Sequence, residues 1–196
     1  MTTSSVSSSA ARSLPGEQGV WVFILIDMSF FCVLFASFVH ERAGAAELFF
    51  SSQQSLDVHL GLINTVVLLT SSWLVALATD TAPGKPRGKI RSLLGMAALC
   101  GAAFAAIKIA EYTTLIRAGI SPVTNDFFMF YFFISFIHLV HVLAGIVVLT
   151  MVVRKRGGEP LLVSERNSLD SAASYWHMVD LIWVLIFAML YLVSWR

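Results

Sequence analysis

The sequence has 196 residues, of which 57% are hydrophobic and only 13% are charged, and its formal net charge is +1 at pH 7. A soluble domain usually carries about 25% charged residues, so this composition excludes an ordinary soluble domain and places the chain in a membrane. The balanced charge also argues against a nucleic-acid partner, which would require a concentrated basic surface.

Five apolar stretches follow a polar amino-terminal segment. Residues 1–18 are rich in Ser, Thr and Ala and have no apolar run, which is typical of a flexible cytoplasmic tail and not of a signal peptide. A bilayer core about 30 Å thick requires about 20 apolar residues in helical conformation. The sequence therefore predicts an all-α fold, in which residues 19–196 form a single integral membrane bundle of five transmembrane helices. The predicted helices cover about 19–40, 58–77, 93–115, 127–153 and 173–195.

The connections between these helices are too short for a soluble domain, and their basic residues indicate the orientation of the chain. The second and fourth connections are rich in basic residues, whereas the first contains only Arg42 and the third only Arg117. The basic residues are Lys85, Arg87, Lys89 and Arg91 in the second connection, and Arg154, Lys155, Arg156 and Arg166 in the fourth. Because cytoplasmic loops are enriched in Lys and Arg, we expect a cytoplasmic amino terminus and an external carboxyl terminus.

Each predicted helix contains a polar or ionisable residue. In a bilayer such groups are unfavourable unless they are paired or face a protein interior, so each is a candidate for a functional site or a polar contact between helices. In chain order they are Asp27, Asn64, Lys108 and Glu111, His138 and His141, and His177 and Asp180.

Depth along the helices predicts which of these groups meet. With a rise of about 1.5 Å per residue, Asp27 and Asp180 lie roughly 10–12 Å from the cytoplasmic edge, and His141 reaches a similar layer from the opposite side. We therefore expect a buried cluster of these three residues. It would either handle protons or lipid headgroups, or simply fix the packing of the helices, and the general behaviour of polar contacts in membranes favours the second reading.

A second polar layer is expected in the outer half of the bundle. Lys108 and Glu111 are three residues apart, so they share a helical face and should form an ion pair. His59 and Asn64 enter the membrane from the same side and are candidates for the same layer.

The histidine pattern argues against a metal centre. His138 and His141 lie one turn apart on one helix, so they cannot approach a haem iron from opposite faces. No HxxxH or HExxH pattern is present either. We therefore expect no metal ligand and no catalytic residue in this chain, and we expect His138 and His141 to form hydrogen bonds between helices.

Motifs in all five helices resemble subunit III of the haem-copper oxidases. The last helix is similar to that family's Tyr-Trp-His-Phe-Val-Asp pattern at Tyr175, Trp176, His177, Val179, Asp180 and Trp183. Shorter similarities occur at Asp27, where most members have Glu, at Asn64 and Thr65, at Glu111 and Tyr112, and at His138, His141, Val142 and Gly145. Longer members carry seven helices, and this chain resembles the five-helix form that lacks the first two.

The resemblance implies a non-catalytic, redox-silent subunit III of a respiratory complex of the cytochrome c oxidase type. Haem and copper would lie in partner subunits I and II. Bound phospholipid would occupy a cleft between the first two helices and the remaining three, and the chain would support assembly, lipid retention and proton uptake in the plasma membrane of a bacterium. In this reading Asp27, His141, His177 and Asp180 are linked to lipid or protons, and Asn64, Lys108, Glu111 and His138 are interior polar contacts.

Three other readings stay open. A nitric oxide reductase accessory subunit, working with that enzyme's catalytic subunit, is the first alternative, and the combination of Lys108, Thr124, Asn125 and Met129 leans toward that branch. The second is a b-type cytochrome or quinone-binding anchor with its own haem. The third is a small transporter that uses Asp27 and Lys108, although the sequence shows neither an internal repeat nor a proline within a predicted helix.

Overall fold

The computed structural model describes residues 18–80, 87–154 and 163–192, and all of its regular elements are helices. In chain order they are α1 (Gln18–Gly44), α2 (Ala46–Gln53), α3 (Val58–Asp80), α4 (Arg87–Arg117), α5 (Asp126–Arg154), α6 (Val163–Phe187) and a terminal π-helical turn, η1 (Ala188–Leu192). Within these ranges, five helices are long and apolar enough to cross a membrane, namely α1, α3, α4, α5, and α6 with η1. The predicted five-helix membrane fold is confirmed, while the predicted tail lies outside the described residues except for Gln18.

Two helical segments were not expected. The last helix begins at Val163, ten residues before the predicted start at 173, because its first turns bury Leu169 and Ala172 while keeping polar residues on the other side. The first connection contains α2, whose Phe49 packs against Phe38 and Phe127 with ring centroids 5.5 and 5.7 Å apart. An apolar window of about 20 residues does not predict either segment, because α2 has only 8 residues and the first turns of α6 mix polar with apolar side chains.

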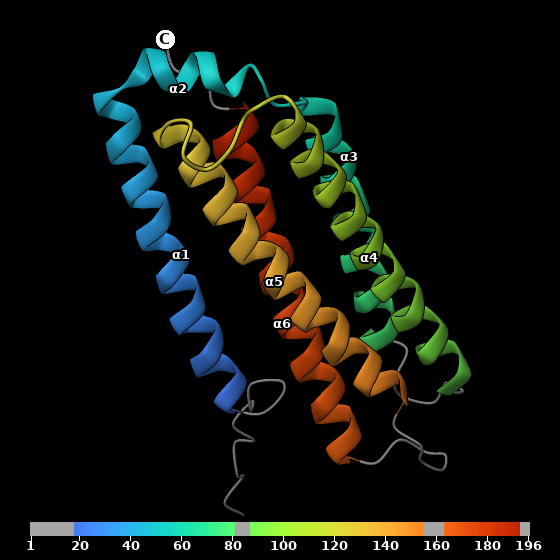
Figure 1. The fold of residues 1–196 in the computed structure, drawn as a ribbon. Helices are drawn as coiled ribbons and strands as arrows, with labels where there is room; N and C mark the ends of the chain where they lie inside the picture. Colours follow the sequence, from blue (N-terminus) through green and yellow to red (C-terminus); the bar gives the residue numbers. More distant parts are fainter. Residues whose placement is uncertain (1–17, 81–86, 155–162, 193–196) are drawn as a thin grey trace, which may run out of the picture.

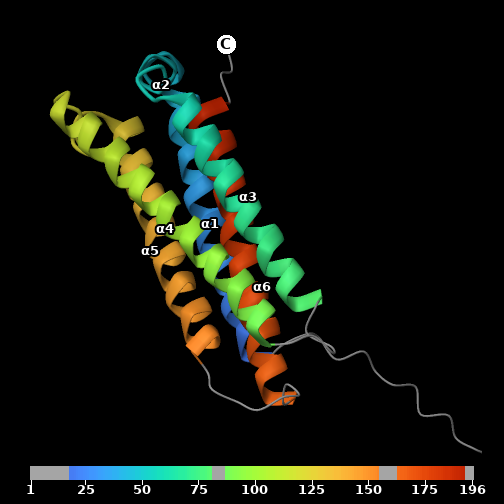
Figure 2. The same ribbon diagram turned by 90° about the vertical axis from the view of Figure 1, so that its right-hand side faces the viewer.

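The helix α6 forms the centre of the bundle, and α1 lies at its edge (Figures 1 and 2). In α6, 61% of the most apolar stretch is buried, compared with 22% in α1. The helix α3 packs mainly against α4 and α6, and α5 packs against α4 and α6. The successive membrane helices alternate in direction, so the first turns of α1 and α6 lie at the same end of the bundle, opposite α2 (Figure 1).

Large aromatic rings packed on glycines bring α6 close to its neighbours. A Cβ atom added to Gly145 of α5 would lie 2.7 Å from the Trp176 ring, and one added to Gly101 of α4 would lie 2.8 Å from it. The indole nitrogens also donate hydrogen bonds to α3, from Trp176 to Ser71 Oγ at 3.0 Å and from Trp183 to Thr65 Oγ1 at 3.1 Å. This close packing fixes the rotation of α6 and therefore the direction of its polar side chains.

Candidate functional site

Asp27 and His141 join the edge helix α1 to α5. Asp27 Oδ1 lies 3.0 Å from His141 Nε2, and His141 Nδ1 donates a hydrogen bond to the carbonyl oxygen of Ile137 at 2.7 Å. Since Nδ1 carries a hydrogen, the contact at Nε2 requires a second proton, held either by the imidazole or by the carboxyl group. The pair therefore has no net charge, which suits its place inside the bundle.

Aromatic groups surround this pair. The Phe31 ring meets the His141 ring edge to face at a centroid distance of 5.6 Å. The Tyr175 hydroxyl of α6 donates to the backbone oxygen of His141 at 3.1 Å. Asp27 Oδ2 is buried and has no hydrogen-bond partner among the described residues. The pair is thus held by contacts from α1, α5 and α6.

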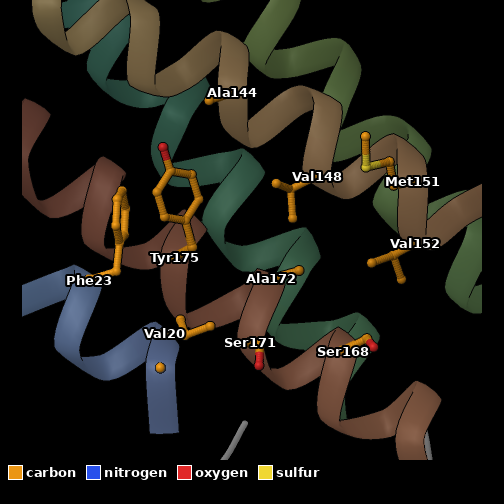
Figure 3. Close-up of a pocket in the computed structure, with 11 residues that line it drawn as sticks. Val20, Phe23, Ala144, Val148, Met151, Val152, Ser168, Ser171, Ala172 and Tyr175 are labelled. Carbon is orange, nitrogen blue, oxygen red and sulfur yellow. The ribbon is translucent and has the colours of Figure 1, made fainter. Parts of the chain in front are cut away.

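An apolar cavity of about 600 Å³ lies between α1 and the α5–α6 pair (Figure 3). The lining residues are Gly19, Val20 and Phe23 of α1, Ala144, Val148, Met151 and Val152 of α5, and Ser168, Ser171, Ala172 and Tyr175 of α6. Asp27 is one helical turn beyond Phe23, and His141 is one turn before Ala144, so the polar pair lies about one turn past the cavity lining. Tyr175, which lines the cavity, reaches the pair through its hydrogen bond to the His141 backbone oxygen. This cavity separates α1 alone from the α5–α6 pair, whereas the predicted cleft separates the first two spans from the remaining three. The difference arises because α3 packs against α4 and α6.

Asp180 does not join the Asp27–His141 pair. The predicted cluster of three residues was therefore right for Asp27 and His141 and wrong for Asp180. Its carboxyl group is 3% exposed, and neither oxygen has a hydrogen-bond partner in the described part of the chain. It faces Ser72 of α3 instead of α1. His177, one turn earlier on α6, lies 2.7 Å through Nδ1 from the Ser72 hydroxyl oxygen.

Lys108 and Glu111 form a fully enclosed ion pair. The Lys108 ammonium donates to Glu111 Oε2 at 2.9 Å, to the Tyr191 hydroxyl at 2.7 Å and to the Tyr131 hydroxyl at 3.0 Å, so all three of its hydrogens are used. The Tyr191 hydroxyl in turn donates to Glu111 Oε1 at 2.6 Å. The rings of Tyr112, Tyr131, Trp183 and Tyr191 lie 4.6–5.4 Å from the ammonium nitrogen. This aromatic cage, with Lys108 at its centre, encloses the ion pair within the bundle.

The expected roles of three other polar residues need correction. His138 is fully buried, and within the described residues neither ring nitrogen has a hydrogen-bond partner. Its ring stacks on Trp183 at a centroid distance of 5.3 Å. Asn64 is also fully buried and its side chain has no hydrogen bond there. His59 is exposed and does not belong to an interior polar layer.

Sequence reasoning missed the hydroxyl groups that complete these sites, which belong to Ser72, Tyr131, Tyr175 and Tyr191. A buried ammonium group needs several hydrogen-bond acceptors. A search for hydroxyl side chains at the same depth as Lys108 in the other helices could therefore have found Tyr131 and Tyr191. Within the described residues, no three His, Cys, Asp or Glu side chains are grouped so that they could hold a metal ion.

Comparison with known proteins places the chain in a family. Residues 15–195 match the family model of cytochrome c oxidase subunit III. The chain belongs to this family. Similar relatives include the cytochrome bo(3) ubiquinol oxidase subunit 3 of Pseudomonas aeruginosa, which is 28% identical over 90% of this chain and 84% of the relative. The cytochrome c oxidase subunit 3 of Thermostichus vulcanus is 29% identical, and the quinol oxidase subunit 3 of Bacillus spizizenii is 28% identical, each over 90% of this chain and 86% of the relative.

The chain is thus a subunit III of a respiratory haem-copper oxidase, and such a subunit is part of a multi-subunit membrane complex. The comparisons give no support to the nitric oxide reductase alternative. As a subunit III chain, it combines two polar centres in one bundle. The Asp27–His141 pair lies about one helical turn from the lining of a cavity that opens at the periphery, whereas the Lys108–Glu111 pair is sealed inside the bundle.

Proposed function

We propose that this subunit III is a non-catalytic component that retains phospholipid in the cavity between α1, α5 and α6 and supports proton uptake by its oxidase. The observation that carries the proposal is an apolar cavity whose lining ends about one helical turn from the Asp27–His141 pair. The oxidase would lie in the plasma membrane of a bacterium, with the amino terminus of this chain in the cytoplasm, as the basic connections predict.

The chemistry of the cavity suits an acyl chain. Most of its lining side chains are aliphatic or aromatic, and its volume of about 600 Å³ falls within the usual range for small-molecule sites. Within a bilayer an acyl chain is already shielded from water, so it would be held in the cavity by van der Waals packing against this apolar lining. A lipid in this position would fill the space beside α1, which has little packing of its own.

The redox reaction would take place in partner subunits. Subunit I, and subunit II where the oxidase has one, would carry haem and copper, while this chain would hold no redox centre. The relatives are named for both quinol and cytochrome c oxidases. The proposal therefore concerns the oxygen-reducing complex that these enzymes share, and it does not depend on the electron donor.

Filling the cavity tests the proposal. Ala144→Trp would place an indole in the cavity, and Leu143→Trp, at an exposed site beside it that does not line the cavity, is the matched control. In complexes purified in mild detergent, Ala144→Trp should reduce the phospholipid detected by mass spectrometry and shorten the active lifetime during turnover, with the initial rate unchanged. If Ala144→Trp and Leu143→Trp retained equal phospholipid and lasted equally long, lipid retention at this site would be ruled out.

A further inference from the structure

Asp180 is a buried carboxyl group without a conventional partner. It lies in the middle of α6, the most enclosed helix, and is only 3% exposed. Neither carboxyl oxygen accepts a hydrogen bond from any group that the structure describes. By contrast, Glu111 receives a hydrogen bond on each oxygen, from Lys108 and from Tyr191. The bundle therefore compensates one buried acid fully and leaves the other without donors.

No opposite charge takes the place of these donors. The ionisable groups that the packed helices carry at membrane depth are Asp27 on α1, Lys108 and Glu111 on α4, His138 and His141 on α5, and His177 on α6 itself. Lys108 gives all its hydrogens to the aromatic cage, and His141 is bonded to Asp27 and Ile137. An ionised carboxylate without a donor or a cation is very unfavourable in such surroundings. The neutral acid is therefore the more stable form at this site, and the carboxylate is the less stable form.

A short path connects Asp180 to the periphery of the bundle. The Ser72 hydroxyl faces the Asp180 carboxyl group as its potential donor, although the two groups do not meet normal hydrogen-bond geometry. On its other side, Ser72 Oγ lies 2.7 Å from His177 Nδ1. Ser72 and His177 are both partly exposed, whereas Asp180 is buried. The three side chains thus lead from the edge of the α3–α6 contact to its interior.

We propose that Asp180 is a proton-binding site that is loaded and unloaded through Ser72 and His177. In the loading step, the imidazolium of His177 gives its Nδ1 proton to Ser72 Oγ while the Ser72 hydroxyl proton passes to Asp180. The imidazolium becomes neutral imidazole, the carboxylate becomes a carboxylic acid, and the serine hydroxyl is restored. A small rotation of the Ser72 hydroxyl and the carboxyl group brings the second pair into contact.

The biological role of this site rests on the proposed function. In the proposed orientation, the first turns of α6 face the cytoplasm, so His177 lies on the cytoplasmic side of Asp180. A neutral acid at this position would store a proton taken from the side on which the oxidase consumes protons. Whether Asp180 binds a proton can be measured in the resting enzyme, without catalytic turnover, and does not depend on the proposed function.

Infrared difference spectroscopy tests the proton site directly. The oxidase complex containing the wild-type chain would be compared, in lipid nanodiscs near neutral pH, with the complex containing Asp180→Asn. The wild type should show the carbonyl band of a protonated carboxylic acid, with its characteristic shift in D₂O, and the Asp180→Asn variant should lack it. Asp170→Asn, which removes a partly exposed acid from the same helix, is the control and should leave the band in place.

The relay is tested by the rate at which the same band responds to D₂O. Ser72→Ala and His177→Phe should each slow the exchange about tenfold or more, because a positioned group that passes on the proton is lost. If the band were absent from the wild type, or unchanged in Asp180→Asn, Asp180 would not hold a proton. If the band were present but exchanged at the wild-type rate in both relay variants, the path through Ser72 and His177 would be wrong. Phospholipid content measured on the same samples reports on the proposed function separately, because loss of lipid in Ala144→Trp does not depend on the Asp180 band.

Discussion

Two buried ion pairs in this chain neutralise charge in different ways. Lys108 and Glu111 use every donor of the ammonium group and both carboxylate oxygens within the aromatic cage. Asp27 and His141 instead share one proton and leave Asp27 Oδ2 without a partner in the described region. The first arrangement is suited to rigidity, and the second to a site beside a cavity where the surroundings can change.

Replacing Lys108 tests the structural role of the cage. Lys108→Met removes the charge that compensates Glu111, and breaking one side of a buried pair typically costs about 3–5 kcal/mol. We expect an unfolding free energy lower by about this amount, measured by titration with a denaturing detergent. The double variant Lys108→Met with Glu111→Gln should recover much of the loss, because no uncompensated charge is left. Equal stability of Lys108→Met and the wild type would contradict a structural role.

Asp27→Asn tests the pair at the cavity. The substitution keeps the shape of the side chain but removes its ability to share a proton with His141. Because hydrogen bonds between membrane helices average about 0.6 kcal/mol, the complex should still assemble and begin turnover normally. Phospholipid should then be lost more readily and activity should decline sooner over many catalytic cycles. Ser29→Ala is the control, since the Ser29 hydroxyl bonds only to the backbone of its own helix, at Leu25. Immediate loss of all turnover in an intact Asp27→Asn complex would argue for a direct part in the reaction.

Spacing and depth predicted only some of the contacts among these residues. A separation of three residues is enough to bring Lys108 and Glu111 together, and depth alone placed Asp27 near His141. Depth does not give the rotation of a helix about its own axis, so Asp180 was assigned to the wrong neighbours. His138 was expected to form a hydrogen bond, but its ring packs against the rings of Phe104 and Trp183. The hydropathy pattern of the sequence does not predict which aromatic rings surround a buried side chain.

At the scale of helices, the sequence predicted the apolar core of each span better than its ends. The start of α6 was placed too late because an apolar window cannot detect a helix that continues into mixed polar sequence. The short helix α2 was missed for the same reason, although Phe49 anchors it to α1 and α5. The positions of helix ends and of short interfacial helices depend on tertiary contacts. The hydropathy of a single segment does not report these contacts.

The contact between α5 and α6 depends on a glycine. A Cβ atom at Gly145 would lie 2.7 Å from the Trp176 ring, a distance that forces the ring or the helix to move. Gly145→Ala should therefore destabilise the chain by about 1–3 kcal/mol, as overpacked cores usually do. Gly95→Ala on α4 is the matched control, since a Cβ atom there meets nothing within 4 Å. The same denaturing-detergent titration would measure both variants, and an equal response would show that close packing at Trp176 is unimportant.

At the scale of the whole molecule, the number of spans followed from hydropathy, but their arrangement did not. Five stretches of about 20 apolar residues are sufficient to predict a five-helix bundle. Which helices pack together depends on matching small and large side chains, such as Gly101 and Gly145 with Trp176. The cavity beside α1 arises from this arrangement, so its position could not be read from any single helix.

The central claim is that this chain works as subunit III of a haem-copper oxidase while the redox centres lie in its partners. The most direct measurement is affinity purification of the chain in mild detergent, followed by mass spectrometry of the co-purifying subunits and an optical spectrum of the preparation. We predict an oxidase subunit I in stoichiometric amount, and haem absorbance that disappears when the partners are stripped from this chain. A chain that purified alone with its own stoichiometric haem, or that brought down a nitric oxide reductase in place of an oxidase, would contradict the claim.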